Sequence, residues 1–400
     1  MLSVAEAGKR VCDAVMTFPA EDCPLINAHG RVLRQTLAAD RDLPPFDRAA
    51  IDGYALQFNA WKMGRRRFHL VGVQAPGTIP LSLPREDACI EVMTGAVLPG
   101  GADVIVPYEE GVIKKGFVEI GCLENLTEGQ AIHRQGSAYR AGAIIVQPGV
   151  RLSGREIAVA AACGYAHLAV TMQPKIAIVT TGDELVDVNS TVAPHQIRRS
   201  NDFALRAALV AAGQPRVERY HLHDMRHEIE HLLWHIVAEY EAVLITAGVS
   251  KEKFDFLPRV LDEIGVKKLV QNVAQRPGKS FWFGLSPRHT PIFFLPGNPP
   301  SAHICLHRYV LPALTKMEGL TLVESRSALL AETVKLTHEV ADFLPVRIKP
   351  GPNGEPIAQP MPFNTSCDFA GLTATDGFVE LPCGHGELPA GTAVRFWPWV

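Results

Sequence analysis

Acidic residues, glycines and prolines follow several apolar runs in the middle of the chain, between residues 175 and 318. Carboxylates are hard oxygen ligands for divalent cations, and glycine turns beside helix N-termini expose backbone amides that bind phosphate or other oxyanions. Because free carboxylates alone would repel an anion, this combination favours a divalent metal together with a phosphorylated or oxyanionic ligand. The candidate residues are Asp183, Glu184, Asp224, Gly248, Ser250, Asp255, Gly297 and Asn298.

The apolar runs predict strands that alternate with helices, which indicates a doubly wound α/β domain with a mostly parallel sheet. Ligands of such sheets bind beyond the carboxyl ends of the strands, where the candidate residues lie. Ser200 is expected to cap one helix, Gly213 to follow its end, and Ser301 to cap a last helix. Strands are predicted at residues 175–180, 216–221, 242–246, 267–273, 280–284 and 291–295, and helices at 200–213, 227–239 and 256–264.

The composition is typical of a globular protein with more than one domain. A chain of 400 residues predicts two to four domains, since one domain takes roughly 150 residues. A formal net charge of −3 argues against dedicated nucleic-acid binding. The eight cysteines show no metal-site spacing, and the chain has neither a signal-peptide pattern nor the roughly 20 apolar residues that a bilayer requires. We therefore expect a soluble, cytoplasmic protein with reduced thiols.

The rest of the chain predicts three further parts around the α/β domain, which is expected at residues 173–318. Short strands between Pro and Gly turns predict an all-β insert at 46–135, within an elongated N-terminal domain formed by 1–45 and 136–172. Residues 325–400 predict a small C-terminal β-barrel, interpreted as a packing module or a support for a dimer.

Two polar stretches in the N-terminal part have alternative interpretations. Residues 42–55, which include Asp52, are typical either of a linker with solvated acids or of a site. The loop at 93–103, which includes Thr94, either lines a site or turns a hairpin. Arg134 belongs to a basic stretch further along the chain. These residues therefore stay candidates on composition alone.

Taken together, six motifs resemble the signature stretches of the MoeA family in order and spacing. That family comprises the molybdopterin molybdenumtransferases and the E-domain of gephyrin, and the resemblance covers nearly the whole chain. It implies a four-part subunit that forms a homodimer, with a central α/β domain like those of molybdenum-cofactor biosynthesis. The motifs are Leu-Pro-Pro-Phe-Asp-Arg-Ala-Ala-Ile-Asp-Gly-Tyr-Ala at 43–55, Met-Thr-Gly-Ala-Val-Leu-Pro-Gly-Gly-Ala-Asp at 93–103, Thr-Gly-Asp-Glu-Leu at 181–185, Ala-Gly-Val-Ser at 247–250, Arg-Pro-Gly-Lys at 276–279 and Leu-Pro-Gly-Asn-Pro at 295–299.

The resemblance implies an enzyme that inserts molybdate into adenylylated molybdopterin and releases AMP, helped by Mg²⁺. Its implied partners are an upstream molybdopterin adenylyltransferase and the apoproteins of molybdoenzymes. The implied catalytic residues are Asp52, Thr94, Glu184, Asp224 and Asp255, of which Glu184, Asp224 and Asp255 would hold the metal, whereas Asp52 and Thr94 would come from the second subunit. The implied cofactor-binding residues are Thr181, Gly182, Asp183, Gly248, Ser250, Arg276, Lys279, Pro296, Gly297, Asn298, Pro299 and Arg134.

The sequence also departs from the family pattern around the expected site. An arginine fork is not equivalent to a lysine point charge, and added cations change the charge of a loop. These departures leave a second interpretation open, a homologue that acts as a non-catalytic molybdopterin-binding or interaction module. The departures are Ala247 for a glycine, Lys251 and Lys253 on the loop that follows, Arg276 for a lysine, Arg199 for an aspartate, and the lack of an acid at Ala138.

Overall fold

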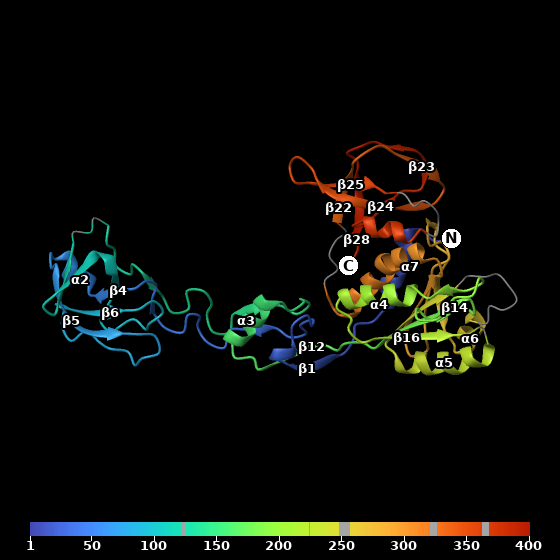
Figure 1. Ribbon diagram of the computed structural model, residues 1–400. Coiled ribbons are helices and arrows are strands. Elements are labelled where there is room, and N and C mark those ends of the chain that lie inside the picture. The colour runs from blue at the N-terminus through green and yellow to red at the C-terminus, as the bar shows by residue number, and fades with distance from the viewer. Residues whose placement is uncertain (122, 124, 224, 248–256, 321–325, 362–367) are drawn as a thin grey trace. The chain divides into compact units, whose positions relative to one another are not determined.

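The computed structural model describes two compact units (Figure 1). Each unit has its own hydrophobic core. The first unit contains residues 1–34, 148–153 and 167–400, and the second contains 35–147 and 154–166. Among the described residues, no helix is long and apolar enough to cross a membrane. The described residues are 1–121, 123, 125–223, 225–247, 257–320, 326–361 and 368–400.

A six-stranded sheet in the order β16-β13-β17-β21-β20-β18 forms the centre of the first unit. The neighbours among β16, β13, β17 and β21 are parallel, whereas β21–β20 and β20–β18 are antiparallel. The predicted mostly parallel sheet is therefore confirmed. The strands are β13 (Ile176–Thr181), β16 (Val217–Leu222), β17 (Ala242–Ala247), β18 (Lys267–Gln271), β20 (Trp282–Leu285) and β21 (Pro291–Pro296).

Helices cover both faces of this sheet because side chains alternate across each strand. Ile176 and Ile178 belong to one core cluster, together with residues of α1, α4, α7, η3 and α8. Ala177 and Val179 belong to the opposite cluster, with residues of α5 and α6. The helices are α1 (Val4–Ala14), α4 (Asn201–Ala211), α5 (Arg226–Glu239), α6 (Leu257–Glu263), α7 (Pro299–Cys305), the π-helix η3 (Leu306–Val310) and α8 (Leu311–Met317).

The helix ends confirm two of the three expected terminal residues. Ser200 occupies the N-cap position of α4, and Gly213 follows the C-terminus of that helix with a φ of +93°. The expected cap at Ser301 is wrong, because α7 has its N-cap at Asn298 and begins at Pro299. A proline favours the first helical position, since its fixed φ is helical and its missing N–H would have no helical acceptor there.

A closed five-stranded barrel near the C-terminus confirms the predicted β-barrel. The ring runs β24-β25-β22-β28-β26, and β26 pairs back onto β24. The short strand β19 (Gln275–Arg276) extends from the α/β region and pairs in parallel with β24. The other elements of this region are β22 (Arg326–Leu330), β23 (Val334–His338), β24 (Ala341–Pro350), β25 (Pro356–Pro360), η4 (Ala370–Ala374), β26 (Gly377–Leu381), β27 (Gly384–Leu388) and β28 (Ala393–Pro398).

Three short additions complete the first unit. The strands β1 (Ala20–Pro24) and β12 (His167–Thr171) form an antiparallel pair. The 3₁₀-helix η1 (Leu25–Asn27) follows β1 directly. The strands β14 (Leu185–Val186) and β15 (Ile197–Arg198) form a parallel pair that precedes α4.

The second unit is built on a six-stranded sheet in the order β7-β4-β6-β5-β9-β8. Its pairs are antiparallel except β5–β6. The predicted β-rich insert is present, with one short helix, α2, added to it. The elements are β2 (Leu37–Ala38), β3 (Arg48–Ala49), β4 (Gly53–Leu56), α2 (Phe58–Lys62), β5 (Arg67–Gln74), β6 (Ala88–Val92), β7 (Val104–Pro107), η2 (Tyr108–Glu110), β8 (Gly111–Lys114), β9 (Phe117–Ile120), β10 (Ile132–His133), β11 (Ile144–Val146) and α3 (Gly154–Ala162).

A buried arginine joins α1, η3 and the barrel within the first unit. Arg308 Nε donates to Glu380 Oε2 at 3.0 Å, and the two side chains are 7% and 15% exposed. The guanidinium also lies 4.7 Å from the ring centroid of Trp397 and donates to the carbonyl of Val4 at 3.4 Å. A Cβ atom at Gly8 would lie 2.7 Å from Arg308 Nη1, so the glycine permits α1 to approach this closely.

We expect Arg308→Met to lower the free energy of unfolding by about 3–5 kcal/mol, because the largely buried Glu380 carboxylate then loses its main cation. The matched control is Arg395→Met, since Arg395 lies 3.9 Å from the other carboxylate oxygen and its side chain is 49% exposed. The control should cost less than about 1 kcal/mol. Urea unfolding measures both variants, and equal losses would show that Glu380 does not depend on Arg308.

Candidate functional site

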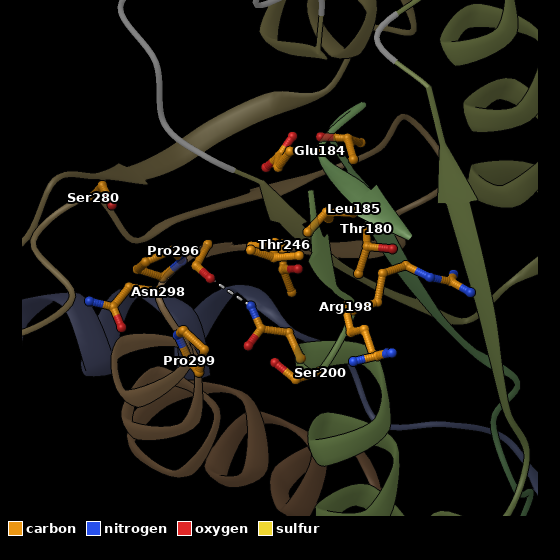
Figure 2. Close-up of a pocket in the computed structure, with 15 residues that line it drawn as sticks. Thr180, Glu184, Leu185, Arg198, Ser200, Thr246, Ser280, Pro296, Asn298 and Pro299 are labelled. Carbon is orange, nitrogen blue, oxygen red and sulfur yellow. Dashed lines mark hydrogen bonds between the residues drawn. The ribbon is translucent and has the colours of Figure 1, made fainter. Parts of the chain in front are cut away.

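A cavity of about 400 Å³ opens at the carboxyl ends of three neighbouring parallel strands, β13, β17 and β21 (Figure 2). The chain moves from β13 to β16 on one side and then returns to β17 on the other side of β13. A crevice forms where a parallel sheet reverses its winding in this way. The cavity is lined by Thr180, Thr181, Glu184, Leu185, Ile197, Arg198, Arg199, Ser200, Asn201, Thr246, Ser280, Pro296, Gly297, Asn298 and Pro299.

The turn after β13 places the carboxylate of Glu184 in the cavity wall. A Cβ atom at Gly182, whose φ is +136°, would lie 2.4 Å from Glu184 Oε2, so a larger residue would displace this carboxylate. The backbone is fixed because Leu185 N–H donates to the Gly182 carbonyl at 3.2 Å and Ile197 N–H donates to the Glu184 carbonyl at 2.8 Å. Neither bond uses the carboxylate of Glu184.

The neighbouring acid, Asp183, is placed differently. Its side chain is 68% exposed, and one carboxylate oxygen lies 3.2 Å from Nδ1 of His223. Asp183 does not belong to the lining of the cavity in the described part of the chain. Of the two adjacent acids, Glu184 is therefore the one that lines the cavity.

The N-terminus of α4 forms another wall of the cavity (Figure 2). Ser200 and Asn201 line it, and Asn201 Nδ2 donates to the Gly297 carbonyl at 2.8 Å, which ties α4 to the turn after β21. The first amides of a helix carry partial positive charge and favour anions. The cavity thus combines a carboxylate with a helix N-terminus, as expected for a ligand that contains both a cation and an anionic group.

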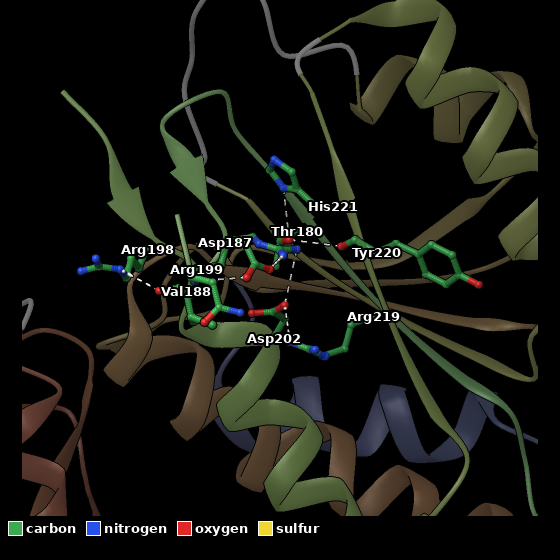
Figure 3. Close-up of polar contacts among 10 residues, drawn as sticks. Thr180, Asp187, Val188, Arg198, Arg199, Asp202, Arg219, Tyr220 and His221 are labelled. Atoms are coloured by element: carbon green, nitrogen blue, oxygen red, sulfur yellow. Dashed lines mark hydrogen bonds and ion pairs between the residues drawn. The ribbon is translucent and has the colours of Figure 1, made fainter. Parts of the chain in front are cut away.

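An ionic cluster around the buried side chain of Asp202 lies at this helix start (Figure 3). Asp202 has no exposed side-chain surface and lies 3.1 Å from Arg219 Nη1 and 3.7 Å from Arg199 Nη1. Arg199 also donates to Asp187 at 2.5 Å. Burial, and then the charge of Arg199, lowers the pKa of the adjacent His221, which keeps its imidazole neutral. Arg199, which the sequence showed only as a departure from the family, is thus an ion-pair partner of Asp202.

The turn that follows β19 contributes Ser280 to the cavity. The side chain of Lys279 is exposed, and the Lys279 carbonyl accepts a hydrogen bond from Val273 N–H at 2.9 Å. Arg276 contacts His338 of β23 through its guanidinium. Within the described residues, neither Arg276 nor Lys279 lines the cavity, although both belong to the predicted site.

The second unit contains the other predicted site residues. Asp52 Oδ1 accepts hydrogen bonds from the Thr94 backbone N–H at 2.7 Å and the Thr94 hydroxyl at 2.8 Å. These two bonds, the backbone one first, lower the pKa of Asp52, so the carboxylate is charged at neutral pH. Arg134 donates to Asp47 at 2.6 Å. The structure therefore brings Asp52 and Thr94 together and pairs Arg134 with an acid of the 42–55 stretch.

The structure brings part of the predicted set into one cavity. No group of three or more His, Cys, Asp or Glu side chains among the described residues could hold a metal ion. The predicted residues in the lining are Thr181, Glu184, Pro296, Gly297, Asn298 and Pro299. Asp224, Gly248, Ser250 and Asp255, and with them Lys251 and Lys253, lie outside the described residues.

Several lining residues were not predicted from the sequence. Thr180 and Thr246 stand at the ends of apolar strands, and Ser200 and Asn201 begin a helix. A polar residue at the end of a buried parallel strand is the signal that indicates the first pair. The Ser-Asn helix start indicates the second pair, since a helix N-terminus at the same sheet edge must face the ligand.

Family models match the chain in three consecutive segments. Residues 2–164 match the MoeA N-terminal region (domain I and II), residues 177–316 a probable molybdopterin binding domain, and residues 327–399 the MoeA C-terminal region (domain IV). The cavity and the α4 helix start lie within the second segment.

Individual relatives match the chain along its whole length. The molybdopterin molybdenumtransferase of Synechocystis sp. is 36% identical over 400 residues and covers 100% of both chains. That of Staphylococcus epidermidis is 27% identical and covers 98% of this chain and 94% of its own. The solved structure of the molybdopterin biosynthesis MoeA protein from Pyrococcus horikosii superposes with a TM-score of 0.83 at 26% identity, covering 100% of this chain and 99% of its own. With all of its main segments matched in order, this chain belongs to the MoeA family.

Proposed function

We propose that this chain is a molybdopterin molybdenumtransferase, which acts in molybdenum cofactor biosynthesis by inserting molybdate into adenylylated molybdopterin and releasing AMP. The observation that carries the proposal is the cavity in which the Glu184 carboxylate and the N-terminus of α4 line one space. Relatives that bear this enzyme's name match the whole chain, which supports the same activity here. No observation favours the alternative of a non-catalytic binding module.

The walls of the cavity suit different parts of such a substrate. Ser200 and Asn201 present the positive end of the α4 dipole, which we assign to an anionic group, a phosphate or molybdate. Gly297, held by Asn201, and the prolines that flank it shape the wall formed by the turn after β21. We assign Lys279 to the oxyanion because an exposed ammonium beside Ser280 supplies a strong donor.

Glu184 fits a magnesium ion, since it is a hard oxygen donor that lines the cavity and whose position depends on Gly182. We propose Asp224 and Asp255, outside the described residues, as the other two ligands. When bound, Mg²⁺ supplies positive charge that offsets the negative charge of the phosphate groups. Glu184 itself holds and orients the cation, and the N-terminus of α4 orients the anion.

We further propose that the chain works as a homodimer in the cytoplasm. Asp52 and Thr94 form a preorganised pair in the second unit, and the family resemblance supports placing this pair of one subunit at the cavity of the other. In such a dimer, we assign Arg134 to the same region, in which residues of one subunit meet the cavity of the other. We propose that each subunit is divided into an elongated N-terminal domain (1–45 with 136–172), a β-rich insert (46–135), an α/β domain (173–318) and a C-terminal β-barrel (325–400). The proposed partners are a molybdopterin adenylyltransferase and the apoproteins of molybdoenzymes.

We expect Glu184→Gln to reduce Mg²⁺-dependent AMP release about 10- to 100-fold, because an amide keeps the shape of the side chain but loses the charge that holds the cation. The measurement supplies adenylylated molybdopterin and molybdate over a range of Mg²⁺ concentrations. Glu263→Gln is the matched control, since Glu263 lies on α6 with an exposed side chain paired to Arg226. Full activity of Glu184→Gln at limiting Mg²⁺ would remove Glu184 from the metal site.

A shared site also predicts complementation between two inactive variants. Asp52→Asn and Glu184→Gln should each retain about a tenth of wild-type activity or less, but a mixed dimer contains one site with both residues intact. If subunits exchange at random in a two-fold dimer, the equimolar mixture should recover about a quarter of wild-type activity. Light scattering checks the dimer independently. A mixture of exchanged subunits that stays inactive would place both residues in the same subunit's site.

A further inference from the structure

A buried glutamine side chain lies under the turn that follows β19. Gln275 is 1% exposed, and its Nε2 donates to the carbonyl of Pro277 at 3.1 Å and to that of Gly278 at 3.2 Å. Its Oε1 accepts a hydrogen bond from the Tyr309 hydroxyl. The amide therefore uses both of its donors and its acceptor, as a buried polar group must.

The elements around Gln275 hold it in one orientation. The ring of Tyr309, which is 1% exposed, stacks on Phe281 with centroids 4.4 Å apart. Cys305 Sγ lies 3.5 Å from Gln275 Nε2, and burial raises the pKa of this thiol to about 12, so the group in contact with the amide is uncharged. With the Tyr309 hydroxyl at the oxygen end, the nitrogen end of the amide must face the turn.

This orientation fixes the direction of two successive peptide groups. The carbonyls of Pro277 and Gly278 both point inward to Gln275. A trans peptide holds N–H and C=O in opposite directions, so the N–H groups of Gly278 and Lys279 point away from Gln275. Gly278 has a φ of +92°, and a Cβ atom there would lie 2.7 Å from both Cys305 Sγ and Gln275 Nε2. The turn therefore packs directly on this network.

We propose that Gln275, oriented by Tyr309, is a positioning residue for oxyanion binding in the transferase. It holds the turn that carries Lys279 next to Ser280, and Ser280 lines the cavity. Neither Gln275 nor Tyr309 touches substrate in this role, and both act through the turn. This inference rests on the proposed function, since it assigns the turn to the oxyanion of the same site.

The test compares Gln275→Met and Tyr309→Phe with wild type. Met matches the length of Gln but cannot donate to the two carbonyls, and Phe keeps the ring of Tyr309 but releases the amide orientation. We expect the KM for molybdate to rise about tenfold in Gln275→Met and by a smaller factor in Tyr309→Phe. The KM for adenylylated molybdopterin should change less than about twofold. Titration of the protein with molybdate alone, followed by calorimetry, should show the same weakening without any turnover.

Thr290→Val is the control for a general loss of stability. Thr290 is 8% exposed and its hydroxyl donates to the Val237 carbonyl at 3.4 Å, so the variant also removes a buried polar group near the same sheet. Its molybdate KM should equal that of wild type. If Gln275→Met lowers the unfolding midpoint but leaves the molybdate KM and Kd unchanged, Gln275 is only structural and the proposal fails.

The two proposals fail in distinguishable ways. A wild-type protein that binds molybdate, with weaker binding in Gln275→Met, but releases no AMP would uphold the role of Gln275 and reject the transferase reaction. Normal AMP release with an unchanged molybdate KM in both variants would uphold the reaction and reject the positioning role. A wild type that neither binds molybdate nor releases AMP would reject both.

Discussion

The parallel alignment of β13, β17 and β21 is the constraint on which the rest of the site depends. Parallel strands end at one edge, so residues that are far apart in the chain, such as Glu184 and Gly297, meet around one cavity. The reversal of winding at β13 leaves a crevice there instead of a packed edge. Residues on short turns at this edge can therefore contact a ligand together, whereas the buried strands provide the stability of the fold.

The same constraint explains how much could be predicted from the sequence. Buried runs such as residues 176–179 are continuous and rich in β-branched residues, so their strands and their parallel pairing were predicted correctly. Strands β22 and β27 were not predicted, since Arg326–Leu330 is short and begins with two exposed residues, whereas Gly384–Leu388 is short, mostly exposed and rich in glycine. Local pattern is weak in such strands because their stability comes from neighbours across the sheet.

Side-chain partnerships were the least predictable part of the site. No spacing rule links Asp202 to Arg219 across two elements, or Asn201 to the carbonyl of Gly297. Arg199 stood out only as an unusual residue type, whereas the structure shows it balancing a carboxylate with no exposed surface. Removing one member of such a cluster leaves a buried charge without its partner, which costs more free energy than the whole cluster contributes. The effect of each residue on stability therefore depends on the others.

The pairing of β19 with β24 also bears on how separable the parts of this chain are. Gln275 and Arg276 align with Ala341 and Asp342, so the turn that follows is bordered by the barrel as well as by the α/β sheet. The barrel therefore holds the backbone of β19, the strand from which the turn begins. A shortened chain that ended after α8 would lose this pairing. Although the α/β region and the barrel are consecutive segments of the sequence, the pairing of β19 with β24 joins them through their backbones.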